Sequence, residues 1–129
     1  CEKPRRFRLL YPLEGSIREK IETIATRVYL ADRVSYDRAA ERQIDYYEQN
    51  GMGHLPVCMA KTHLSLSHDP ALKGVPRGFV APVREVRVSA GAGFLYALLG
   101  TVRTMPGLPS RPAFMDVDLD ADGQVRGLF

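Results

Sequence analysis

The chain has 129 residues, of which 45% are hydrophobic and 26% are charged. This length suffices for one domain that buries about two-thirds of its unfolded surface. No apolar run approaches the roughly 20 residues that cross a bilayer, so we expect a soluble protein with no membrane partner. Two cysteines, Cys1 and Cys58, make no disulfide framework and favour a reducing, cytoplasmic setting.

The excess of positive charge is small and is spread along the sequence. There are 18 Lys and Arg residues against 15 Asp and Glu, for a net charge of +3. The one dense basic group, within residues 3–8, lacks the interleaved aromatic side chains of single-strand binders, so we expect no nucleic-acid partner. Residue 1 is Cys rather than Met, and no signal peptide follows it, which indicates a part of a longer chain.

A partly extended lead-in at 1–15 precedes the first of two predicted helices. Ser16 and Glu19 have the spacing of a capping box, in which each side chain bonds the backbone of the other residue. Behind them, apolar residues recur at intervals of three and four, which predicts an amphipathic helix over 17–30.

A second amphipathic helix is predicted after Ser35 or Asp37, either of which would cap it. Asn50 and Gly51 supply the left-handed residue that ends such a helix. Its apolar stripe is narrower than that of the first helix and consists of Tyr36, Ala40, Ile44 and Tyr47.

Strand patterns follow the helices. Residues 55–60 form a nearly continuous apolar run, which predicts a buried strand with Cys58 as a small core residue. Residues 83–88 alternate apolar and charged side chains, as in a strand with one wet face. Residues 94–99 fit either a second apolar strand or a short buried helix. Between the first two runs, residues 61–78 are rich in Thr, Ser, His, Asp, Pro and Gly, which predicts a long ordered loop. Such a loop is uncommon in a compact domain unless it is functional.

The last residues predict a terminal hairpin, with 115–119 and 125–128 paired around an Asp-Ala-Asp-Gly turn. Asp118, Asp120 and Asp122 also match the first half of a calcium loop, but the residue at its twelfth position is Phe129 instead of Glu. A hairpin turn is therefore the better interpretation. The fold class is mixed α/β (α+β), with N-terminal helices packed on a small mixed sheet.

A metal site has little support in the sequence. His54, Cys58, His63 and His68 are all of metal-ligand type, but their spacings of four, five and five match no zinc pattern. An odd spacing along a strand would also send Cys58 and His63 to opposite faces. We expect no metal ligands here.

Two polar or small-residue segments follow predicted strands, where ligands collect in α/β sheets. The turn at 89–93, Ser-Ala-Gly-Ala-Gly, would let backbone N–H groups approach an anion or a flat ring, although packing or a bulge also explains it. The other segment is the polar stretch 61–70, which follows the strand predicted at 55–60. Within it, Ser67 and Asp69 would equally serve to turn the chain before Pro70. Its candidate residues are Lys61, Thr62, Ser65, Ser67, His68 and Asp69.

Several separated strings resemble the C-terminal part of the formate–tetrahydrofolate ligase family, also called formyltetrahydrofolate synthetases. They are Leu-Pro-Val-Cys-Met-Ala-Lys-Thr at 55–62, Ser-Leu-Ser-His-Asp-Pro at 65–70, Val-Arg-Val-Ser-Ala-Gly-Ala-Gly-Phe at 86–94, Thr-Met-Pro-Gly-Leu-Pro at 104–109, and the closing Gly-Leu-Phe. The similarity extends from about residue 7 to the end and agrees in order and spacing.

The resemblance implies a part of an ATP-dependent ligase that joins formate to tetrahydrofolate through formyl phosphate. The products would be 10-formyltetrahydrofolate, ADP and phosphate. The resemblance also implies a homotetramer that needs magnesium and is helped by a monovalent cation. The family's glycine-rich phosphate loop is missing from these residues. We therefore expect residues 1–129 to be a C-terminal domain that is inactive alone, binds no cofactor alone, and has the rest of the ligase as its partner.

The resemblance adds a third candidate loop, which includes Met105, Pro106 and Gly107, to the turn of Ser89, Ala90, Gly91 and Gly93. These loops would complete the nucleotide and folate side of the cleft. Two alternatives stay open: a structural or oligomerisation domain without ligand contacts, and a free-standing small protein that binds a nucleotide or folate without turnover. The sequence leaves open whether the parent is monofunctional or fused to dehydrogenase and cyclohydrolase activities.

Overall fold

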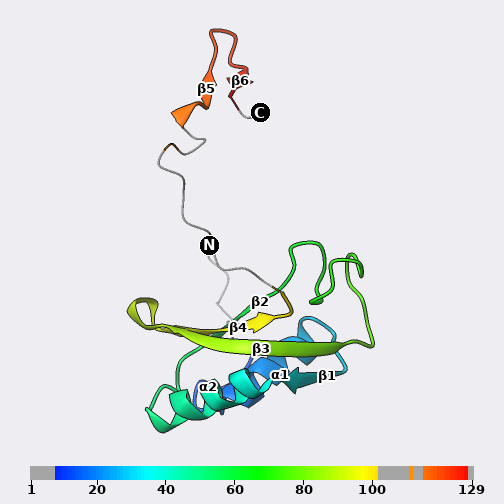
Figure 1. The fold of residues 1–129 in the computed structure, drawn as a ribbon, viewed down its shortest axis with the longest axis vertical. Helices are drawn as coiled ribbons and strands as arrows, with labels where there is room; N and C mark the ends of the chain where they lie inside the picture. The colour runs from blue at the N-terminus through cyan, green and yellow to red at the C-terminus, as the bar shows by residue number, and fades with distance from the viewer. Residues whose placement is uncertain (1–7, 102–110, 112–114, 128–129) are drawn as a thin grey trace, which may run out of the picture.

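The structure is a computed structural model that describes residues 8–101, 111 and 115–127. Two helices and a four-stranded sheet form its body, and a two-stranded hairpin follows (Figure 1). This arrangement confirms the mixed α/β class. Among the described residues, no helix has the length and apolar character needed to cross a membrane.

The first helix, α1 (Ile17–Arg27), begins as predicted. Ser16 accepts a hydrogen bond from the Glu19 N–H at 3.2 Å, and the Glu19 carboxylate accepts one from the Ser16 N–H at 2.8 Å. The helix ends three residues earlier than expected, because the chain turns toward the sheet through Leu30, whose φ is +62°.

The strand β1 (Arg33–Tyr36) was not predicted, and it corrects the extent of the second helix. Tyr36 lies in this strand instead of in the helical stripe. The helix α2 (Arg38–Gln49) has Asp37 at its N-cap position, but the Asp37 side chain makes no capping hydrogen bond. Gly51 ends this segment with a φ of +74°, as the sequence predicts.

The sheet has the strand order β1-β3-β4-β2. β3 (Val80–Ser89) pairs in parallel with β1 and antiparallel with β4 (Phe94–Leu99), and β4 pairs in parallel with β2 (Val57–Ala60). Residues 94–99 are therefore a strand and not a helix. β2 and β4 end at one end of the sheet, whereas β3 ends at the other.

The core lies between the helices and one face of the sheet, and Figure 1 shows both helices on the same side. Ile17, Ile21 and Ile44 are fully buried there. From the sheet, the alternate positions of each strand face these helices. The sheet residues in this core include Val57, Met59, Ala81, Val83, Val86, Leu95, Ala97 and Leu99.

Cys58 is exposed, which contradicts its predicted place in the core. The strand β2 is buried on alternate residues and not on both faces. The reason is that the helices cover only one face of the sheet, and Cys58 lies on the other. In register beside it are Tyr96 and, on the next strand, Arg87.

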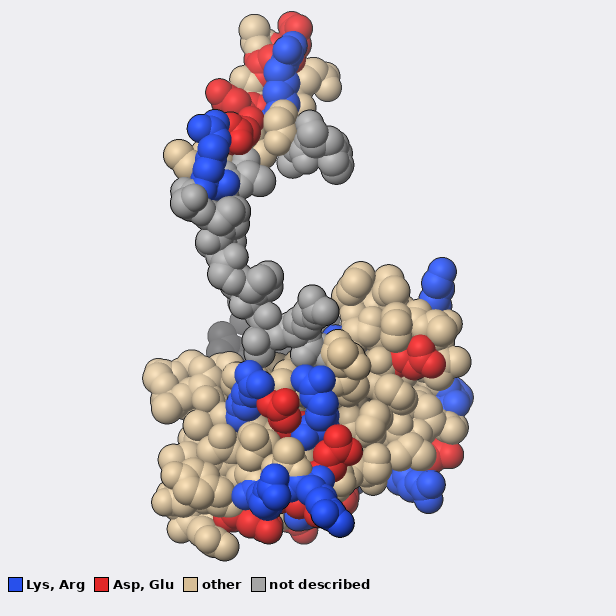
Figure 2. Space-filling model, viewed as in Figure 1, with Lys and Arg blue, Asp and Glu red and all other residues tan. Residues whose placement is uncertain are grey.

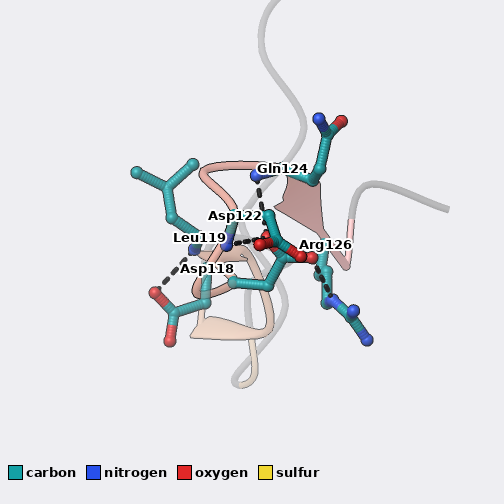
Figure 3. Close-up of polar contacts among 6 residues, drawn as sticks. Asp118, Leu119, Asp122, Gln124 and Arg126 are labelled. Carbon is teal, nitrogen blue, oxygen red and sulfur yellow. Dashed lines mark hydrogen bonds and ion pairs between the residues drawn. The ribbon is translucent and has the colours of Figure 1, made fainter.

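The hairpin of β5 (Asp118–Leu119) and β6 (Val125–Arg126) confirms the predicted C-terminal pairing, with shorter strands. Asp120 builds its turn: the carboxylate accepts from the N–H groups of Asp122 at 3.0 Å and Gln124 at 2.9 Å. It also accepts from Arg126 Nε at 2.9 Å (Figure 3). These oxygens are used within the turn, as the hairpin interpretation requires.

Candidate functional site

A hollow of about 540 Å³ lies at the end of the sheet where β2 and β4 finish. It is open to solvent and is formed by the loop after β2 together with the first residues after β4. Four of the predicted site residues line it, and the other four lining residues, His63, Pro70, Gly100 and Thr101, were not among the predicted ones. The lining residues are Lys61, Thr62, His63, His68, Asp69, Pro70, Gly100 and Thr101.

Lys61 fastens the loop that forms this hollow. Its ammonium group donates hydrogen bonds to the carbonyls of Thr62, at 3.0 Å, and Ser65. The same ammonium lies 5.7 Å from the centre of the Tyr29 ring, within the range of a cation–π contact. Most of the binding capacity of Lys61 is therefore used within the chain.

Ser65 and Ser67 form a buried network behind the hollow. Their hydroxyl oxygens lie 2.9 Å apart, and the Ser67 hydroxyl donates to the Asp69 carbonyl at 3.1 Å. The Asp69 carboxylate accepts from the Ala71 N–H at 2.8 Å, just beyond Pro70. Ser67 and one carboxylate oxygen of Asp69 therefore hold the turn around Pro70. This is the role that the sequence offered as the alternative to ligand binding.

His68 lies between the hollow and the body of the protein. Its ring centre is 6.3 Å from that of Phe79, and its Nδ1 is buried with no hydrogen-bond partner among residues 8–101, 111 and 115–127. Gly100, at a φ of +59°, passes close to it: a Cβ at Gly100 would lie 3.2 Å from the His68 Cβ. Gly100 therefore allows the end of β4 to pack on His68.

The turn after β3 is a short 3₁₀ helix over Ala90–Ala92 that connects β3 to β4. Gly93 closes it with a φ of +72°, and its N–H donates to the Ser89 carbonyl at 2.8 Å. A Cβ added at Gly91 would meet nothing within 4 Å. Because no described residue would contact a side chain at this position, packing within the described chain does not explain glycine at 91.

The two predicted loops lie at opposite ends of the sheet. Ser89 pairs with Phe94 at the start of β4, whereas Val83 pairs with Leu99 at its end. Since the hollow lies beyond Leu99, this chain does not bring the 89–93 turn and the 61–69 loop into one site. The third candidate loop, with Met105, Pro106 and Gly107, lies outside the described residues.

The sheet face away from the helices carries a charged group that was not singled out in the sequence. The Arg87 guanidinium lies 2.6 Å from the Glu85 carboxylate, which raises the pKa of Arg87. Arg84 also lies near Glu85, at 3.6 Å. Figure 2 shows basic and acidic side chains interleaved on the face in view. The Glu85 carboxylate is thus shared by two guanidinium groups.

Metal-ligand side chains do not gather in the part of the chain that is described. No three His, Cys, Asp or Glu side chains there are placed to hold an ion. His63 and His68 both line the hollow, whereas Cys58 lies on the open sheet face.

The mixed sheet, with loops held at its strand ends, is the class of α/β scaffold on which binding residues are commonly placed. Comparison with known proteins then defines the family. The family model for formate–tetrahydrofolate ligase matches residues 1–129. The chain belongs to the formate–tetrahydrofolate ligase family.

Its relatives include bacterial ligases and a larger animal protein. The chain is 62% identical to formate–tetrahydrofolate ligase of Saccharopolyspora erythraea and 59% identical to that of Roseiflexus castenholzii, in each case over 99% of this chain and 23% of the relative. It is 56% identical to the cytoplasmic C-1-tetrahydrofolate synthase of Mus musculus, over 99% of this chain and 14% of that protein. The chain thus spans about a quarter or less of the relatives it matches.

Proposed function

We propose that this chain is the C-terminal part of an ATP-dependent ligase that joins formate to tetrahydrofolate, giving 10-formyltetrahydrofolate, ADP and phosphate. The family match over all 129 residues supports the reaction class. In this proposal the enzyme is a cytoplasmic homo-oligomer, and the remainder of the ligase chain is the first partner of this segment. The segment contributes surface to the nucleotide and folate side of the cleft.

The proposal gives no catalytic step to these 129 residues. Phosphoryl transfer needs a loop and a metal that hold the ATP phosphates, and the sequence has no glycine-rich phosphate loop with its Lys. The donor set of the described residues does not suit magnesium either, because its acidic side chains do not cluster. In this proposal, magnesium and the monovalent cation bind to the rest of the enzyme.

The observation that carries the proposed binding role is the bare turn at Gly91. The backbone there has no positive φ that requires glycine, and the position where a Cβ would lie is empty space. The folded chain would accept alanine at this position at no steric cost. A need for glycine at 91 would therefore come from something outside this chain that approaches the backbone closely, such as a flat ring.

The replacement Gly91→Ala in the full-length ligase tests this role. In the isolated chain it should leave stability unchanged or raise it by about 0.4–1 kcal/mol, since alanine restricts the unfolded state. In the full-length enzyme we expect the Michaelis constant for ATP or tetrahydrofolate to rise about tenfold, a loss of roughly 1.4 kcal/mol in binding. Gly53→Ala is the matched control, because Gly53 likewise has no positive φ and an added Cβ there would make only an ordinary contact, 3.8 Å from the Glu48 side chain.

The second candidate function is a structural or oligomerisation domain. It is favoured by the internal hydrogen bonds of Lys61 and Ser67, which hold the loop instead of facing a ligand. If this role is right, Gly91→Ala lowers the stability or the tetramer content of the full enzyme and leaves both Michaelis constants unchanged. Calorimetry on the 129-residue chain with ATP or folate tests the remaining possibility, a free-standing binder.

A further inference from the structure

The C-terminal hairpin has one apolar and one charged face. Leu119 and Val125 are direct cross-strand partners and so lie on the same face. Val117, two residues before Leu119 and just outside the strand, adds a third exposed apolar side chain to this part of the chain. Asp120 and Arg126 form their ion pair on the other face (Figure 3).

The apolar face is open to solvent in this chain. The exposed fractions are 37% for Val117, 64% for Leu119 and 53% for Val125. The charged face needs no further partner, because the Asp120 carboxylate already accepts from Arg126 and two N–H groups of its own turn. The surface left to be covered is therefore apolar and uncharged.

The hairpin is too small to be stable without cover. Each strand has two residues, whereas a two-stranded hairpin is at best marginally stable in water even when it is longer. Yet its backbone is closely specified: Gly127, at a φ of +77°, packs so tightly on the Asp116 carbonyl that no Cβ would fit. A closely specified hairpin with an open apolar face indicates a docking element.

We propose that the face of Val117, Leu119 and Val125 docks on an apolar surface in the part of the ligase polypeptide that lies outside these residues. The relatives contain the hairpin within a much longer chain: the match to the ligase of Desulforamulus reducens covers 100% of this chain and 23% of that protein. Most of the relative's length is thus available to cover the face. The inference rests on the proposed function, since it takes the remainder of the ligase as partner.

Amide hydrogen exchange without ligands tests the docking. We compare residues 117–126 in the full-length ligase and in the 129-residue chain. Exchange should be slow in the ligase and fast in the shorter chain. The double replacement of Leu119→Thr and Val125→Thr should speed exchange in the ligase by about tenfold or more, as expected when buried apolar side chains are lost. Asp118→Thr, on the same strand but the opposite face, should leave it slow.

Three results would overturn the docking. They are fast exchange in the full-length ligase, equally slow exchange in the shorter chain, and protection that disappears when the ligase is diluted to monomers, which would make a second copy the partner. If the double variant does not fold, Val117→Thr gives the same test, since Val117 lies outside the strand pairing. The exchange experiment uses no nucleotide or folate, so its result is independent of the Gly91→Ala kinetics. Exchange can disprove the docking while the kinetics support the binding role, and the kinetics can disprove the binding role while exchange supports the docking.

Discussion

The Tyr11 hydroxyl closes the outer edge of β2 at Val57, from which it accepts an N–H hydrogen bond at 2.9 Å and to whose carbonyl it donates one at 3.2 Å. The Tyr29 hydroxyl continues this edge by donating to the Met59 carbonyl at 3.3 Å. Because β2 is the last strand of the sheet, its outer backbone groups would otherwise lack partners in the fold.

Tyr11→Phe should therefore destabilise the chain by about 1–3 kcal/mol, since it leaves a partly buried N–H and carbonyl unpaired. Urea unfolding of the 129-residue chain measures this loss. Tyr46→Phe is the control, because that ring is 59% exposed; its effect should stay within about 0.5 kcal/mol. Equal effects of the two replacements would show that the edge of β2 does not depend on Tyr11.

Lys20 is fully buried, and its ammonium donates to the carbonyls of Gly53 and Leu55. Burial lowers the pKa of Lys20, although Glu14 and Glu48 act in the opposite direction. We expect Lys20→Met to cost roughly 1–3 kcal/mol, because both carbonyls lose their donor. Lys73→Met, at an exposed position, is the control in the same unfolding experiment. A Lys20→Met variant as stable as the parent would mean that relief from burying the charge outweighs the lost bonds.

Tyr36 makes stability depend on alkaline pH. Burial, and then Glu22, raise its pKa above the ordinary value of 10.0, although Arg18 lowers it. The unfolded chain thus releases the phenolic proton first, so this part of the stability is present below pH 10.0 and is lost as the pH rises above it. Tyr36→Phe should lose less stability than the parent between about pH 8 and about pH 11 in urea titrations. Lys20 is present in both proteins, so its titration cancels in the comparison. Equal losses of stability in Tyr36→Phe and in the parent would contradict the assignment of this pH dependence to Tyr36.

Asp120 controls the hairpin turn. The Gln124 N–H, and then Arg126, lower the pKa of this carboxyl. The carboxylate's contribution is therefore present above the ordinary pKa of 3.8 and is lost as the pH falls through the lower, folded-state value. In the full-length ligase, where the hairpin is proposed to be covered, we expect Asp120→Ala to abolish the nuclear Overhauser effects between Leu119 and Val125, and acid to weaken them. Asp122→Ala keeps the N–H that Asp120 bonds and should retain them; loss in both variants would contradict the role of Asp120.

Local signals account for the parts of the fold that the sequence predicts well. The capping box at Ser16 and Glu19 needs only residues three apart, and the start of α1 is correct. β1 was missed because its alternation of polar and apolar residues spans only four positions, and the strand is held by pairing with Val80–Ser89, far along the chain. Cys58 was misplaced for a related reason: an apolar run does not reveal that only one face of its sheet is covered.

For the candidate site, too, local signals in the sequence predict well and long-range strand pairing is missed. The sequence correctly places polar loops after strands, and four predicted residues line the hollow. It does not give strand direction, and the antiparallel pairing of β3 with β4 is what separates the 89–93 turn from the 61–69 loop. Gly100 and Thr101 line the hollow because β4 runs parallel to β2, a pairing that no local pattern in residues 94–101 indicates.

The most direct test of the proposed function is a structure of the full-length ligase with ATP and tetrahydrofolate bound. We expect atoms of the 89–93 turn, or of the 61–69 or 105–109 segments, within about 4 Å of one of these ligands. A complex in which all three segments lie beyond contact distance of both ligands would contradict the binding role and leave the structural domain as the function of this chain.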